Sequence, residues 1–140
     1  MSIEWKILHP EDHPGPYKYE LVDTAVIRLS QFFPTAKNDW VRTTGHPVPF
    51  HGFISFSRGY RWDGASGPTI DTPDTMEASL VHDGLYQLMR DGVTPLSYRK
   101  AADIEFSRLL REAGMKSWRR WYWYAAVRMA GGNRIKRDMA

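Results

Sequence analysis

The sequence has 140 residues, which suits one domain with a single hydrophobic core. Apolar residues make up 42% of the chain and aromatic residues 14%, which indicates a folded protein rather than a disordered one. There is no cysteine, so disulfides, thiolate metal ligands and a cysteine nucleophile are excluded. The formal net charge is +3 at pH 7.

The first 70 residues predict the β-rich half of the protein. The start of the chain lacks the basic and apolar regions of a signal peptide, so we expect synthesis in the cytoplasm without one. The stretch "YKYELVDTAVIRL" (17–29) predicts two short strands joined near Asp23. Further strands are predicted in "DWVRTT" (39–44) and in "FHGFISFSRGYRWDG" (50–64). We expect these strands to form a small, mostly antiparallel sheet.

Residues 71–132 change to helical spacing. A first helix is predicted from the N-cap Thr72 and Pro73 to Asp91-Gly92, and a second from Ser97 to Gly114. The third is expected from about residue 117 to residue 130, where Gly131-Gly132 should end it, and the tail 133–140 is expected to fray. The pattern therefore predicts one α+β domain over residues 1–140, with an N-terminal sheet followed by two or three helices.

The stretch "LVHDGLYQL" (80–88) places an ionisable pair inside an apolar run. Adjacent helical side chains point about 100° apart, so Asp83 cannot orient His82. The short turn "DGVTP" predicts that the first two helices form an antiparallel pair, with Asp103 at about the height of His82. We expect a His82–Asp103 dyad in which His82 is a general base and the hydroxyl of Tyr86, one turn on, supports the cluster.

Asp83 is then available for a second task, such as binding a metal. The segment "YRWDGASGP" (60–68) contains Gly64 and Gly67 and predicts a bend whose backbone carbonyls converge. Calcium accepts such carbonyls together with carboxylates, here Asp83 and Asp63. The sequence therefore predicts a calcium site formed by Asp83, Asp63 and Gly64.

The motifs "HDGLY" (82–86) and "AD" followed by an aromatic residue (Ala102, Asp103, Phe106), behind a Gly-rich loop, resemble phospholipase A2. The resemblance is closest to the cysteine-free forms in parvovirus capsid proteins. It implies that His82 activates water, that Asp103 orients His82, and that Asp83 binds calcium with loop carbonyls. The expected activity is hydrolysis of a phospholipid ester.

A second set of motifs covers most of the chain: "GYRWDGASGPTI", "LVHDGLY", "KAADIEF" and "YAAVRMAGG". Together they resemble a phage and prophage family catalogued as a domain of unknown function. The resemblance implies a phage origin and gives no activity. Together with the phospholipase-like site, it leads us to expect a phage-encoded hydrolase made in the host cytoplasm, with virion association as a further expectation. The alternative is a non-enzymatic structural or accessory phage protein.

The segment from Arg108 to Arg137 carries nine basic residues and one acid, Glu112, interleaved with aromatic residues. Trp118, Arg119, Arg120 and Trp121 are its candidate interface residues. Such a segment favours an anionic partner, with a phospholipid surface preferred over nucleic acid. In the non-enzymatic alternative, the same surface docks a partner that is a protein, such as a virion or other phage protein, a membrane or a nucleic acid.

Three other interpretations of the His82 cluster remain open. The cluster could be structural, with the histidine and Asp103 joining two helices. Ser66 could be a nucleophile completing a triad with them, although its flanking sequence is not a nucleophile elbow. The order of His51, His82-Asp83 and Asp103 also matches metal phosphohydrolases of the HD class.

Overall fold

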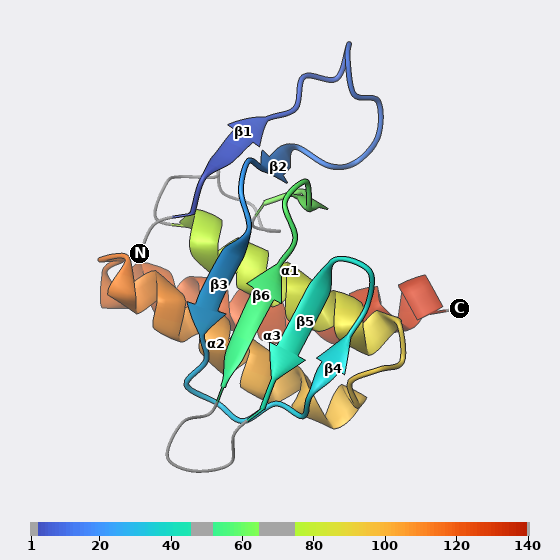
Figure 1. Ribbon diagram of the computed structural model, residues 1–140. Helices are drawn as coiled ribbons and strands as arrows, with labels where there is room; N and C mark the ends of the chain where they lie inside the picture. Colours follow the sequence, from blue (N-terminus) through green and yellow to red (C-terminus); the bar gives the residue numbers. More distant parts are fainter. Residues whose placement is uncertain (1–2, 46–51, 65–74, 140) are drawn as a thin grey trace.

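The computed structural model describes residues 3–45, 52–64 and 75–139, with side chains through Ala130. Its elements follow the predicted order, with strands first and helices after them (Figure 1). Among the sequence predictions, the N-cap Thr72 with Pro73, the loop residues Ser66 and Gly67, and His51 lie outside the described residues.

The strands form two antiparallel sheets rather than one. The three-stranded sheet has the order β1-β2-β7 and contains β1 (Trp5–Ile7), β2 (Tyr19–Leu21) and β7 (Arg61–Trp62). The four-stranded sheet has the order β3-β6-β5-β4 and contains β3 (Ala25–Arg28), β4 (Ala36–Lys37), β5 (Val41–Thr44) and β6 (Phe53–Phe56).

Residues 17–29 do contain the two predicted strands, but β2 and β3 belong to different sheets. The Asp23 carboxylate accepts the backbone N–H of Thr24 at 2.8 Å and fixes the bend between them. Each strand then pairs with a distant partner, β2 with β7 and β3 with β6. Local periodicity predicts the strands but not these long-range pairing partners.

Three helices follow the sheets: α1 (Met76–Arg90), α2 (Arg99–Glu112, after a 3-10 turn over Leu96–Tyr98) and α3 (Ser117–Met139). The end of α1 at Asp91-Gly92 is as predicted, and Gly92 has the left-handed φ of 76° that terminates many helices. Figure 1 shows α2 running back along α1, so the predicted antiparallel pair is present.

The prediction that α3 stops before Gly131-Gly132 is wrong. The helix continues to Met139, and the segment expected to fray is helical over most of its length. A glycine costs about 1 kcal/mol in a helix interior, but it retains its N–H and can propagate the hydrogen-bonded ladder. The residues after the glycine pair include basic residues with good helix propensity, and these favour its continuation.

One contiguous core joins the strands to all three helices. Alternate residues of β3 and β5 are buried, so one face of the four-stranded sheet contacts the helices. Helix α1 lies at the centre, with Leu80, Val81 and Leu85 completely buried. Figure 1 shows α1 and α2 behind the four-stranded sheet, with α3 behind these two helices.

Gly84 lies where α1 packs directly against the side chains of β6. A methyl group at this position would overlap the ring of Phe56, which is itself buried. We expect Gly84→Ala to lower the free energy of unfolding by about 1–2 kcal/mol, because overpacking exceeds the gain in helix propensity. Denaturant unfolding measures the change. Gly84→Ala should cost less free energy of unfolding in a Phe56→Leu background, where the ring is absent. An equal loss in both backgrounds would contradict overpacking against Phe56 as the cause.

Candidate functional site

The candidate site lies where α1 contacts α2. His82 and Tyr86 are one turn apart on α1 and face α2, where Asp103 lies in the second turn. His82 Nε2 is 2.7 Å from Asp103 Oδ1, and the Tyr86 hydroxyl donates to the same oxygen at 2.6 Å. The structure therefore brings together the three residues that the sequence predicts to form the cluster.

Aromatic rings hold the imidazole of His82 in place. Its ring centroid lies 4.1 Å from that of Tyr86 and 5.1 Å from that of Phe106. Because Nε2 faces Asp103, Nδ1 is the nitrogen that remains for proton transfer. The side chain keeps 11% of its surface exposed, whereas Asp103 is fully buried.

Two arginines complete the surroundings of Asp103, and the sequence analysis missed both. Arg128 of α3 donates from Nη1 to Asp103 Oδ2 at 2.8 Å, and Arg99 Nη1 is 3.6 Å from the same oxygen. The guanidinium of Arg99 also donates to the backbone carbonyl of Arg128 at 3.2 Å. The i,i+4 spacing of Arg99 and Asp103 on a predicted helix is enough to predict their ion pair. Nothing local in the sequence indicates Arg128.

These contacts keep the Asp103 carboxyl ionised. Burial by itself raises its pKa, but hydrogen bonding and the charge of His82, with hydrogen bonds from Tyr86 and Arg128, outweigh burial and lower it below 3.8. Burial, followed by the hydrogen bond to Asp103, raises the pKa of the Tyr86 phenol. Tyr86 therefore remains a protonated donor, and Asp103 remains a charged acceptor.

Asp83 lies on a different face of α1 from His82, as helix geometry predicts. One turn earlier, Ser79 Oγ accepts a hydrogen bond from Trp62 Nε1 at 3.1 Å, which ties the end of β7 to α1. Asp63 and Gly64 follow directly after β7.

The pKa of the Tyr60 phenol depends on the charges of the predicted metal ligands. Burial raises this pKa, and the negative charges of Asp83 and Asp63 raise it further, while Arg90 lowers it. Among the residues in the described ranges, no group of three His, Asp or Glu side chains is arranged to hold a metal ion. A cation at this position would thus also need backbone carbonyls, the donors that the glycine-containing loop was predicted to supply.

The candidate interface residues lie at the start of α3. Trp118 and Trp121 are 69% and 70% exposed, while Trp123 is buried against Phe106. Arg119 and Arg120 are half-buried. Within the described part of the chain, no helix combines the length and the apolar character needed to cross a membrane.

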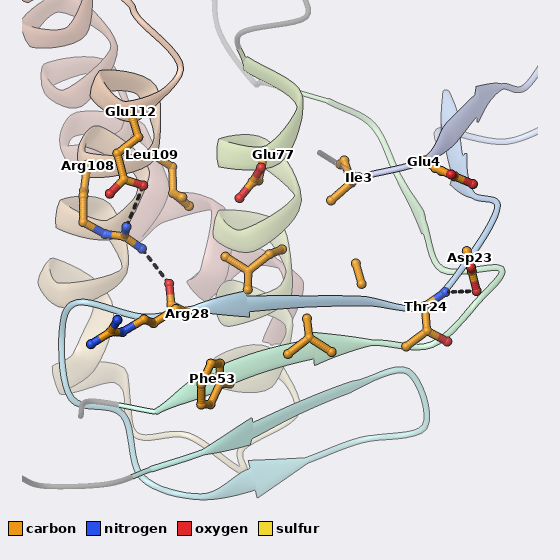
Figure 2. A pocket seen from close by; sticks show the side chains of 13 residues that line it. Ile3, Glu4, Asp23, Thr24, Arg28, Phe53, Glu77, Arg108, Leu109 and Glu112 are labelled. Atoms are coloured by element: carbon orange, nitrogen blue, oxygen red, sulfur yellow. Dashed lines mark hydrogen bonds and ion pairs between the residues drawn. The ribbon is translucent and has the colours of Figure 1, made fainter. Parts of the chain in front are cut away.

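A separate hollow of about 440 Å³ lies along β3, between Glu77 of α1 and the end of α2 (Figure 2). Burial raises the pKa of the Glu77 carboxyl. Arg108 donates to the Arg28 carbonyl at 2.7 Å and to Glu112 at 2.8 Å, so its charge is used within the fold. None of the residues that line this hollow belongs to the His82 cluster, so the hollow does not extend that site.

The comparisons with known proteins give one match. Residues 49–127 match the model of a family described as "Protein of unknown function (DUF1353)". This range contains His82, Tyr86 and Asp103, together with the start of α3. No curated protein and no solved structure matches the chain.

Proposed function

The chain belongs to the DUF1353 family, whose function is unknown, and we propose that it is a hydrolase in which His82 activates water to cleave a lipid ester. The observation that carries the proposal is the 2.7 Å contact between His82 Nε2 and a buried, ionised Asp103. A carboxylate in this position holds the imidazole in one tautomer, with the proton on Nε2, and stabilises the imidazolium that forms during catalysis.

The proposed reaction is a single hydrolysis. His82 Nδ1 takes a proton from water as the water oxygen attacks the ester carbonyl. The C–O bond to the alcohol then breaks, and the proton on Nδ1 passes to the leaving alkoxide. The products are a carboxylic acid and an alcohol. Asp103 and Tyr86 do not contact the substrate in this scheme, so they act as positioning residues.

Calcium is part of the proposal as a bound ion near Asp83. A carboxylate and the carbonyls of a turning, glycine-containing segment are the oxygen donors that this cation prefers, and Gly64 has a φ of 81° that only glycine adopts readily. Asp83, Asp63 and the Gly64 carbonyl would hold the ion. When bound, it would supply positive charge beside the oxyanion that develops on the ester.

Fatty-acid release from phospholipid vesicles tests this function directly. The wild-type protein and the His82→Ala variant are incubated with vesicles, once with calcium and once with a chelator. The proposal expects release by the wild type alone, and the chelator arm measures the contribution of the ion. Absence of release above the variant under any metal condition overturns it.

The exposed part of α3 supports an anionic lipid surface as the place of action. Trp118 and Trp121 present indole rings to solvent, with Arg119 and Arg120 between them in the sequence. Aromatic and basic side chains on one helix suit the boundary between water and anionic lipid. A phage origin and virion association, suggested by the motif resemblance, belong to the same proposal.

We expect the Trp118→Ala/Trp121→Ala variant to bind anionic vesicles about tenfold or more weakly than the wild type, because two exposed indoles are lost. Vesicle co-sedimentation measures the binding. Trp40→Ala, which removes an exposed indole from the sheet half, serves as the matched control and should bind normally. Equal binding by the double variant and the wild type would contradict a lipid role for this surface.

The second candidate is a non-enzymatic docking protein. It is favoured by Arg128 and Arg99, which join the second oxygen of Asp103 to α3 and α2 and make this carboxylate a structural centre for three helices. In that case the exposed indoles of α3 bind a virion protein. Absence of both fatty-acid release and vesicle binding, together with capture of a purified virion protein, favours this candidate.

A further inference from the structure

A hollow of about 470 Å³ opens on the face of α1 that carries Asp83 rather than His82. It is lined by residues from the loop before β2, β2 itself, the turn before β5, the β6–β7 connection, β7 and α1, namely Tyr17, Glu20, Trp40, Gly59, Tyr60, Arg61 and Gln87. None of them belongs to the His82–Asp103 cluster. The volume lies within the range of roughly 300–1,000 Å³ that small-molecule sites occupy.

Aromatic rings form much of this wall. Trp40 is 45% exposed and Tyr17 is 50% exposed, whereas Tyr60 is buried. The indole of Trp40 lies against the backbone of Gly59, where an added Cβ would be 3.5 Å from Cζ3. Gly59 has a φ of 91°, so the turn that lets the indole pack here favours glycine. The result is an exposed, flat apolar surface.

Hydrogen bonds within the fold hold the backbone around Trp40 in place. Asn38 Oδ1 accepts the N–H groups of Trp40 at 2.9 Å and Val41 at 2.7 Å. Asn38 in turn donates from Nδ2 to Asp91 at the end of α1, at 2.8 Å. The Trp40 carbonyl accepts the N–H of Ser57 at 2.9 Å. A wall held in this way loses little conformational entropy on binding.

Gln87, one of the residues that line the hollow, carries a buried polar atom that the described fold does not satisfy. Gln87 Oε1 is buried, and no residue in the described ranges donates a hydrogen bond to it. A buried acceptor without a donor costs about 1–3 kcal/mol, so turning this amide to meet a ligand O–H or N–H in the hollow is favoured. This is an observation independent of the aromatic wall.

The charged groups at this hollow are already paired with one another. Glu20 accepts from Arg61 Nε at 2.8 Å and lies 3.2 Å from Lys6 Nζ. A carboxylate has about four lone-pair positions, so Glu20 can still accept hydrogen bonds from a ligand. A neutral ligand with several hydroxyl groups suits these acceptors better than an ion does.

We propose that this hollow binds a neutral saccharide. The apolar face of the sugar ring packs on Trp40 beside Tyr17. The Gln87 amide turns from its buried position so that Oε1 accepts a hydrogen bond from one hydroxyl, and other hydroxyls bond to Glu20 and Arg61. This binding is a function separate from ester hydrolysis, because the residues that line the hollow include neither the His82–Asp103 cluster nor the proposed calcium ligands.

NMR titration of the full chain tests the proposal. The probes are D-glucose, D-galactose, N-acetyl-D-glucosamine and disaccharides of each, up to concentrations on the order of tens of millimolar. The signal is the indole N–H of Trp40, assigned with the Trp40→Phe variant. At least one probe should give a saturable shift. Trp40→Ala should weaken its binding about tenfold or more, because the stacking surface is lost.

Gln87→Leu separates a binding role from a structural one. The variant should lose the bound sugar's hydrogen bond and bind about tenfold more weakly, while its free energy of unfolding stays the same or rises. Tyr122→Ala, which removes another exposed aromatic ring on α3, should leave sugar affinity unchanged. Three results overturn the proposal: no probe binds, Trp40→Ala binds normally, or ethanolamine or adenosine shifts the Trp40 signal while no sugar does.

Discussion

Replacing Asp103 by alanine should lower the free energy of unfolding by about 3–5 kcal/mol, the cost of breaking a buried ion pair by removing one partner. The carboxylate is fully buried and contacts His82, Tyr86, Arg128 and Arg99. Its loss leaves two guanidinium groups and a phenol without their shared acceptor, in a region of low solvent access. Chemical denaturation at neutral pH measures the change.

The matched control is Glu112→Ala on the same helix. Glu112 also pairs with an arginine, at 2.8 Å from Arg108, but its side chain is 56% exposed. Solvent screens such a pair, so Glu112→Ala should lower the free energy of unfolding by less than about 1 kcal/mol. Similar losses in the two variants would contradict the central position of Asp103 in the fold.

The pH dependence of this effect has a definite sign. The folded-state pKa of Asp103 lies below its usual value of 3.8, so the ionised carboxylate stabilises the folded state. That stabilisation is complete above the usual pKa and is lost as the pH falls through the lowered one. The stability difference between wild type and Asp103→Ala should therefore shrink in this acid range. A difference that stays constant into acid would contradict the assignment.

Replacing His82 should have the largest effect on activity. If His82 is the general base, His82→Ala should reduce fatty-acid release by about 10²–10⁴-fold, the usual contribution of a positioned base. His82→Gln is the more informative variant, because its amide N–H can still donate to Asp103 while no group remains to take a proton. It should fold like the wild type and lack activity.

The control for His82 is His9→Ala, which changes an exposed histidine in the loop after β1. This variant should retain full release, and thermal unfolding should verify that all three proteins are folded at the assay temperature. Full activity in folded His82→Gln would exclude His82 as the base. Asp103→Asn should lower kcat rather than raise KM, because it acts through the imidazole and not on the substrate.

The sequence predicted much of the candidate site because its parts follow from local geometry. The helix period separates His82 from Asp83, and the short connection between α1 and α2 sets the height of Asp103. The structure has the resulting pair at 2.7 Å, with Tyr86 on the same oxygen. The catalytic roles of these residues stay predictions until the activity is measured.

Other features could not be predicted from local patterns. Arg128 reaches Asp103 across 25 residues of sequence, so its contact depends on how α3 packs on α2. The strands of residues 17–29 were found, but their division between two sheets depends on pairing with β6 and β7. The Gly131-Gly132 pair does not end α3, because a cost of about 1 kcal/mol per glycine does not by itself end a helix.

The sequence by itself determined the α+β class, the helix pair and the His82–Asp103 contact, because each depends on periodicity and on connections only a few residues long. The tertiary structure alone decided which groups surround Asp103, how the strands divide between two sheets, and that Trp40 and Gln87 line one hollow. Those features join segments that are far apart in the chain. Their proximity is set by the packing of the whole core, which no local pattern encodes.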